Sequence, residues 1–209
     1  TPLRGGTLVV AISNDIHGIN PLISGADSQT TAVLVRLFLH LFEELPDYHE
    51  HPPTFAPSLV ESFDWSADAT LLVLELRSDV SWSDGVPVTA EDVRWTWQAQ
   101  TDPDLAWGYA QSKENIRDVE VTGPHSLEIH FHRASPSQLA DLNEGVILPR
   151  HACGDLPYEE WRSNESWFVE QVVVNGQFDR ESWSRPEEVV WRRSEAWPRH
   201  GLAGGERGG

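Results

Sequence analysis

The stretch APSLVESFDWSADATLLVLELRSDVSWSDGVPVTAEDVRWTW, residues 56–97, is the most informative part of the sequence because strand, turn and helix signals follow one another in it. Residues 72–77 alternate leucine with Val, Glu and Arg, which is the period-two pattern of a half-buried strand. Residues 82–85 (WSDG) predict a turn, because Asp can bond its own backbone and Gly accepts a positive φ. Residues 89–92 (TAED) form a capping box, so we predict a helix that begins at Thr89.

The order of residues in this stretch is more specific than the elements it predicts. The pattern L-x-E-S-x-x-W-S, followed by L-R-x-x-V-x-W-S-D-G-x-P-V-T-A-x-D-V-x-W-T-W, resembles the signature of the family 5 extracellular solute-binding proteins. These are the oligopeptide, dipeptide and nickel receptors of ABC importers. The resemblance spans roughly residues 5–197. The other segments that resemble the family are Gly5–Ala11, Leu22–Leu41, Ile116–Phe131, Ile147–His151, Val174–Phe178 and Glu188–Arg193.

The resemblance implies a mixed α/β fold, the N-terminal lobe of a type II periplasmic-binding-protein-like fold with a smaller inserted domain. Residues 1–42 would form the first part of domain I, residues 43–151 the inserted domain II, and residues 152–197 the return to domain I. Residues 198–209 form a Gly-rich tail. Members of the family are about twice as long, and two lobes close around their ligand. The second lobe lies beyond the aligned residues, so we expect a fragment or a natural truncation.

The resemblance also implies a function as the substrate-binding component of an ABC importer. Such a receptor captures peptides or similar small solutes outside the cytoplasmic membrane and delivers them to the ABC permease subunits. We expect no enzyme activity, no cofactor and no metal. The protein would be periplasmic or extracellular, with membrane contact only through a removed signal or a lipoprotein anchor. The surface that would face the missing lobe predicts dimer formation.

Composition excludes several other classes of protein. With 209 residues, 39% of them hydrophobic, the chain can bury a core in one or two domains. The net charge of −18 argues against nucleic-acid binding, which needs clustered Lys and Arg, and Lys113 is the one lysine in the sequence. The longest apolar run, around residues 32–42, falls short of the roughly 18 to 20 residues that span a bilayer.

Motifs of catalysis and of redox chemistry are missing from the sequence. It contains no G-x-S-x-G elbow, no G-x-x-x-x-G-K phosphate loop and no H-E-x-x-H helix. Cys153 is the single cysteine, so no intrachain disulfide can form, and we expect a buried, inert thiol. These observations agree with a binding protein.

Two segments are candidate ligand contacts. Trp107 and Tyr109 follow the predicted helix in a loop that, in similar receptors, puts an aromatic side chain near the ligand. The alternative is plain packing of the loop. Asp15, Ile16, His17 and Asn20 leave the first predicted strand, at a place where the receptors it resembles bond the ligand main chain. The alternative for this segment is a turn ended by Pro21, with Asp15 or Asn20 bonding the local backbone.

Two histidine pairs raise a metal hypothesis. His49 and His51 lie two residues apart before Pro52, in what reads as an exposed loop. His130 and His132 have the same spacing, which on a strand places both on one face. Zinc or nickel would suit imidazole ligands, but neither pair has the spacing of a structural zinc site. A solvated strand face accounts for the second pair.

Two alternative functions stay open beside the transport receptor. The first is a ligand-sensing or protein-interaction domain derived from the receptor fold. The second is a metal carrier or metal-dependent enzyme that uses the histidine pairs. A melting temperature that Zn²⁺ or Ni²⁺ leaves unchanged would remove the second alternative.

Overall fold

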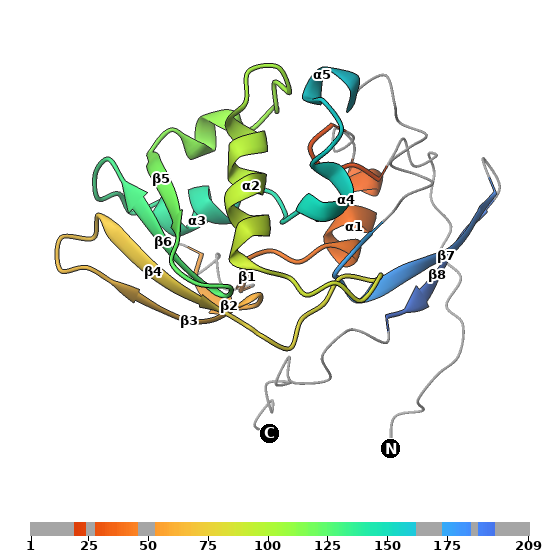
Figure 1. Cartoon of the computed structure of the whole chain (residues 1–209), viewed down its shortest axis with the longest axis horizontal. Helices are drawn as coiled ribbons and strands as arrows, with labels where there is room; N and C mark the ends of the chain where they lie inside the picture. The colour runs from red at the N-terminus through yellow and green to blue at the C-terminus, as the bar shows by residue number, and fades with distance from the viewer. Residues whose placement is uncertain (1–18, 24–27, 46–52, 162–172, 185–187, 195–209) are drawn as a thin grey trace.

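The computed structural model describes residues 19–23, 28–45, 53–161, 173–184 and 188–194, and the fold is a mixture of helices and antiparallel strands (Figure 1). The helices are α1 (Ser28–Leu37), α2 (Ala90–Thr101), the 3₁₀ helix η1 (Ala110–Lys113), α3 (Gln138–Asn143), α4 (Arg150–Cys153) and α5 (Tyr158–Trp161). The strands are β1 (Phe42–Glu44), β2 (Phe55–Pro57), β3 (Val60–Trp65), β4 (Leu71–Leu76), β5 (Ile116–Val121), β6 (Ser126–Phe131), β7 (Phe178–Ser184) and β8 (Glu188–Arg193).

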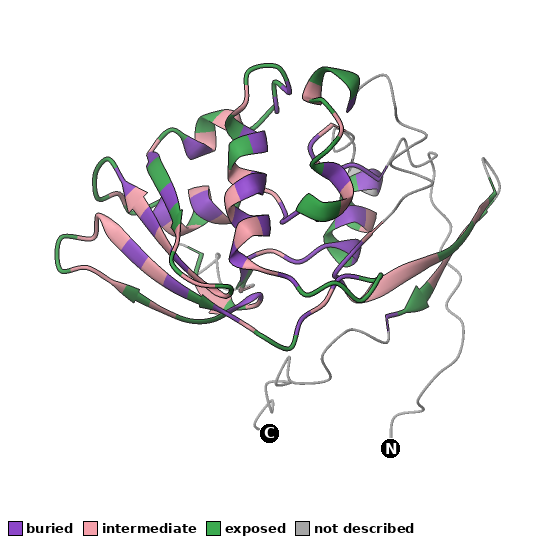
Figure 2. Ribbon diagram, viewed as in Figure 1, coloured by how far each residue is buried: buried purple, intermediate pink, exposed green. Residues whose placement is uncertain are grey.

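A four-stranded antiparallel sheet in the order β3-β4-β6-β5 forms one end of the molecule, and α2 lies over one of its faces (Figure 1). The strand predicted from the leucine alternation is β4, and Leu72, Leu74 and Leu76 are all buried. Buried residues alternate with more exposed ones along β4 and β6 (Figure 2), so the inner face carries the core and the outer face meets solvent.

The turn and the helix that follow β4 also form as predicted. Gly85 adopts φ +88° and donates its N–H to the carbonyl of Trp82 at 2.9 Å, while the Asp84 carboxylate accepts the N–H of Val86 at 3.1 Å. Thr89 is the N-cap of α2, and the Asp92 carboxylate accepts the Thr89 backbone N–H at 2.9 Å. A local sequence signal therefore sets both the turn and the start of the helix.

The C-terminal end of α1 is held by a segment that lies far away in the sequence. The backbone N–H groups of Asn175 and Gly176 donate to the carbonyl of Leu37 at 3.2 and 2.8 Å. The side-chain oxygen of Asn175 accepts the N–H of Leu39 at 2.9 Å. These bonds satisfy backbone groups that the helix end leaves without intrahelical partners. The segment then continues into the antiparallel hairpin β7-β8, at the opposite end of the molecule from the four-stranded sheet (Figure 1).

Helix α5 packs against α2 through aromatic side chains. Trp161 is fully buried, its ring centroid lies 6.1 Å from that of Trp95, and its indole N–H donates to the carbonyl of Leu156 at 3.0 Å. The Tyr158 ring meets Trp161 edge-on at 5.4 Å. The helices of the described part of the chain are all too short or too polar to cross a membrane.

The fold agrees with the mixed α/β class expected from the sequence. The predicted boundary between residues 42 and 43 falls inside β1, which pairs with β2 in a small antiparallel ladder. The division into domains stays a prediction. The Gly5–Ala11 strand expected from the resemblance lies outside the described residues.

Candidate functional site

Trp107 and Tyr109 lie in the predicted loop after α2, but their surroundings differ. Trp107 is only 6% exposed, and its ring meets that of Tyr109 edge-on at a centroid distance of 5.7 Å. The Nζ atom of Lys113 lies 5.7 Å from the centre of the Trp107 ring. Tyr109 is 59% exposed. Trp107 therefore packs the loop onto the core, while Tyr109 presents an aromatic surface to solvent.

Lys113 anchors the same loop from inside the molecule. It is 2% exposed, and its Nζ donates to the carbonyl oxygens of Asp141, Leu142 and Glu144 at 2.7, 2.8 and 2.7 Å. These carbonyls lie at and just after the C-terminal end of α3, where a cation is favoured. Burial lowers the pKa of Lys113 from 10.5 to about 7, against the opposing effect of the Glu144 and Asp141 carboxylates.

We expect the Lys113 ammonium to titrate near pH 7, and this makes stability depend on pH. Between pH 7 and pH 10.5 the unfolded chain holds this proton and the folded chain has released it, so the contribution of Lys113 to stability rises with pH. The slope is at most about 1.4 kcal/mol per pH unit. NMR of protein labelled at lysine would follow the titration of the single Lys113 side chain. Urea unfolding of wild type and Lys113→Met between pH 7 and pH 10.5 would measure how the difference in their stability changes with pH. A midpoint near 10.5 would contradict this expectation.

Asn20 is the one residue of the other candidate segment that the structure describes. It is 2% exposed, and its side-chain oxygen accepts the N–H of Leu22 at 2.9 Å, which is the turn expected as the alternative interpretation. Its side-chain Nδ2 has no hydrogen-bond partner among the described atoms. A buried amide donor without a partner is uncommon in folded proteins, so this atom marks Asn20 as a residue of interest. Asp15, Ile16 and His17 lie outside the described residues.

A groove of about 550 Å³ opens beside the end of α1, and sequence reasoning did not find it. Its walls come from the end of α1, from β1 and β2, from the end of α3 and from Gln177. Apolar rings such as Phe38 and Phe55 mix there with charged groups such as Glu43 and Arg77. Asn20, Trp107 and Tyr109 are not among the described residues that line it. The groove joins segments that are far apart in the sequence, so no local pattern could have grouped them.

One of the two histidine pairs, His130 and His132, lies in the described part of the chain. His130 lies on β6, 3.5 Å from a Glu128 carboxylate oxygen and 3.8 Å from one of Glu120. β6 ends at Phe131, and His132 follows the strand with its side chain exposed. His49 and His51 lie outside the described residues. The neighbours of the His130 imidazole are therefore two carboxylates, those of Glu120 and Glu128.

Cys153 sits in the core, as the sequence predicts for a lone cysteine. It is buried at the end of α4, and burial raises the pKa of its thiol to about 12. The thiolate is the nucleophilic form of cysteine, so this thiol is unreactive at neutral pH.

Comparison with known proteins identifies the family. Residues 54–207 match the bacterial extracellular solute-binding proteins, family 5 (middle region). The chain belongs to this family. The periplasmic oligopeptide-binding protein OppA of Escherichia coli K12 is 31% identical over an alignment of 175 residues, and the alignment covers 74% of this chain and 30% of OppA. The probable peptide-binding protein YejA of Agrobacterium fabrum is 27% identical over 93% of this chain and 31% of its own length.

Solved structures of family 5 proteins share the fold. The oligopeptide-binding protein AppA of Bacillus subtilis, in complex with a nonapeptide, superposes with a TM-score of 0.82 at 21% identity, over 94% of this chain and 38% of AppA. NikZ of Campylobacter jejuni, in complex with Ni(L-His), gives a TM-score of 0.74 at 25% identity, over 91% of this chain and 36% of NikZ. These matches confirm the fold expected from the sequence, and the match of residues 54–207 confirms the family.

Members of family 5 are substrate-binding proteins of transporters, and they act in the periplasm or outside the cell. The chain spans about a third of the length of the relatives that it matches, between 30% and 38% in the four examples. That share is less than the half expected from the sequence. For this chain, the activity of the complete relatives is therefore a proposal.

Proposed function

We propose that this chain is part of the substrate-binding component of an ABC importer, which captures peptides or similar small solutes and delivers them to the permease subunits. The match of residues 54–207 to family 5 carries this proposal. The similarity to OppA, named as a periplasmic oligopeptide-binding protein, supports peptides as the solute class. The chain would bind and release its ligand without chemical change, and so would not be an enzyme.

The ligand main chain would contact the segment that contains Asp15, Ile16, His17 and Asn20. The ligand side chains would contact the loop that contains Trp107 and Tyr109. The buried Asn20 amide supports the first part, because its Nδ2 is a donor without a partner among the described atoms. The exposure of Tyr109 supports the second part. Trp107 would act by holding the loop, since its ring packs against Tyr109 and Lys113.

Isothermal titration with a peptide mixture tests the proposal, with E. coli OppA as the positive control. A ligand enclosed by two lobes loses most of its exposed surface, and one lobe buries much less of it. We expect the 209-residue chain to bind peptides at least about a hundredfold more weakly than OppA, which corresponds to a few kcal/mol. Weak binding that is abolished by Asn20→Ala would support the site. Micromolar or tighter binding by residues 1–209 would contradict the two-lobe argument.

We also propose that the protein acts in the periplasm or outside the cell, held near the permease by a lipid anchor or released after removal of a signal. The family membership supports this location. A surface that would face a second lobe favours dimerisation of the chain in isolation. A native mass spectrum would report both the oligomeric state and any retained solute.

A further inference from the structure

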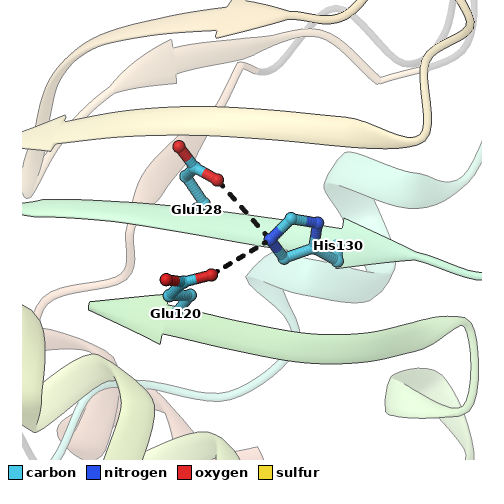
Figure 3. A group of neighbouring side chains, drawn as sticks. All are labelled: Glu120, Glu128 and His130. Carbon is cyan, nitrogen blue, oxygen red and sulfur yellow. Dashed lines mark ion pairs between the residues drawn. The ribbon is translucent and has the colours of Figure 1, made fainter. Parts of the chain in front are cut away.

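Three chemically matched side chains gather on the outer face of the four-stranded sheet, away from the core. Glu128 and His130 lie two residues apart on β6, so both point to the same face. Glu120 on β5 is the direct cross-strand partner of Glu128. Figure 3 shows both carboxylates directed toward the imidazole of His130.

The distances between the three groups suit a small divalent cation. The His130 Nε2 atom lies 3.5 Å from Glu128 Oε2 and 3.8 Å from Glu120 Oε2, and the three ligand atoms all lie within 4.8 Å of one another. Zinc binds nitrogen and oxygen at about 2.0–2.2 Å, which puts neighbouring ligand atoms of a tetrahedron about 3.4 Å apart. Small side-chain rotations would bring the atoms to that spacing without any movement of the strands.

The electrostatics of this face also favour a cation. Glu120 and Glu128 are carboxylates directly opposite each other on neighbouring strands, an arrangement that is destabilising when nothing lies between them. Asp118 stands opposite His130 in the same ladder, and Glu75 lies on the same face of β4, so the surrounding field is negative. The net charge of −18 extends that field over the chain.

We propose that Glu120, Glu128 and His130 bind a divalent transition-metal ion of the zinc class on the outer face of the sheet. An imidazole with two carboxylates selects such an ion over Mg²⁺ or Ca²⁺, which prefer oxygen ligands alone. The side chains of Glu120, Glu128 and His130 are 62%, 32% and 20% exposed, so water completes the coordination. The ion would tie β5 to β6, a role separate from the capture of solute.

Calorimetric titration of the metal-free 209-residue chain with Zn²⁺ tests this site. We expect one ion per chain, a raised melting temperature and no competition by a large excess of Mg²⁺. His130→Ala, Glu120→Gln and Glu128→Gln should each weaken binding at least about tenfold, because even loss of an outer-shell partner lowers metal affinity by 10- to 100-fold.

His132→Ala and Glu75→Gln are the matched controls, since they remove an exposed imidazole just beyond β6 and a carboxylate of the same face. Both should lower the affinity for Zn²⁺ far less than loss of a ligand does, because neither side chain belongs to the cluster of Glu120, Glu128 and His130. The double variant His49→Ala/His51→Ala separates this site from the other histidine pair. Unchanged binding in His130→Ala, loss of binding in the His49/His51 double variant, or saturation only by several weakly held ions would each overturn the proposal.

Discussion

Replacing Asp92 with alanine is expected to lower the free energy of unfolding by at least about 3 kcal/mol. The Asp92 side chain is buried, and its Oδ1 atom accepts the backbone N–H of Arg150 at 2.9 Å. Its Oδ2 atom accepts the N–H of Thr89 at 2.9 Å and the indole N–H of Trp82 at 3.4 Å. Alanine would leave these donors without their acceptor, and each buried donor that loses its partner costs about 1–3 kcal/mol.

Urea unfolding of Asp92→Ala beside Glu91→Ala separates the buried network from a general effect of removing an acid near the helix N-terminus. Glu91 lies in the same first turn of α2, is partly exposed, and pairs with Arg94 at 2.6 Å. We expect Glu91→Ala to cost less than about 1 kcal/mol, as is usual for an exposed ion pair with a small contribution from the helix dipole. Equal losses in the two variants would show that the carboxylate network contributes little.

The Asp92 network explains why one short stretch of sequence predicted so much of the fold. The bonds from Asp92 to Thr89 and to Trp82 are local, and they fix the start of α2 against the turn before it. The bond to Arg150 joins the same side chain to a segment 58 residues away. Thr96, one turn along the helix, accepts the N–H of Leu148 at 3.0 Å and so extends this contact. The side chains of Asp92 and Thr96 on α2 therefore bond both the start of their own helix and the distant segment of residues 148–150.

Periodicity and capping predicted β4, the turn and α2, because those elements are determined by neighbours in the chain. The three carbonyl partners of Lys113 and the walls of the groove depend on segments that meet only in the fold. No pattern in the sequence shows which distant segments will contact each other. The register of β5 against β6 could not be predicted from the sequence either, and this register places Glu120 beside Glu128.

The candidate ligand site stays a prediction, and the structure adds to it only where its residues are described. The sequence placed Trp107 and Tyr109 in one loop, but it could not show which of them is exposed. The structure does so, because Trp107 packs against Lys113 while the Tyr109 ring stays at the surface. Asn20 forms the turn that its position before Pro21 suggested and still keeps an amide donor without a described partner. The two interpretations of Asn20 are therefore compatible.

Gly176→Ala is expected to destabilise the chain by about 3 kcal/mol or more, because the end of α1 lies against the Gly176 backbone. A Cβ atom at this position would clash with the carbonyl oxygen of Arg36 and would lie 2.5 Å from the carbonyl carbon of Leu37. Both are backbone atoms, so the two segments would have to separate. Separation would break the bonds from Asn175 and Gly176 to Leu37 and the bond from Gln177 to Arg36.

Gly108→Ala is the matched control for Gly176→Ala, since a Cβ atom there meets no other atom within 4 Å. Its stability should stay within about 1 kcal/mol of wild type, with a small gain from the stiffer unfolded chain. Thermal and urea unfolding of both variants would measure the difference. Equal stability of Gly176→Ala and wild type would mean that the segment of residues 174–177 does not hold the end of α1. A large loss confined to Gly176→Ala would show that the return segment and α1 form one cooperative unit, as the fold requires.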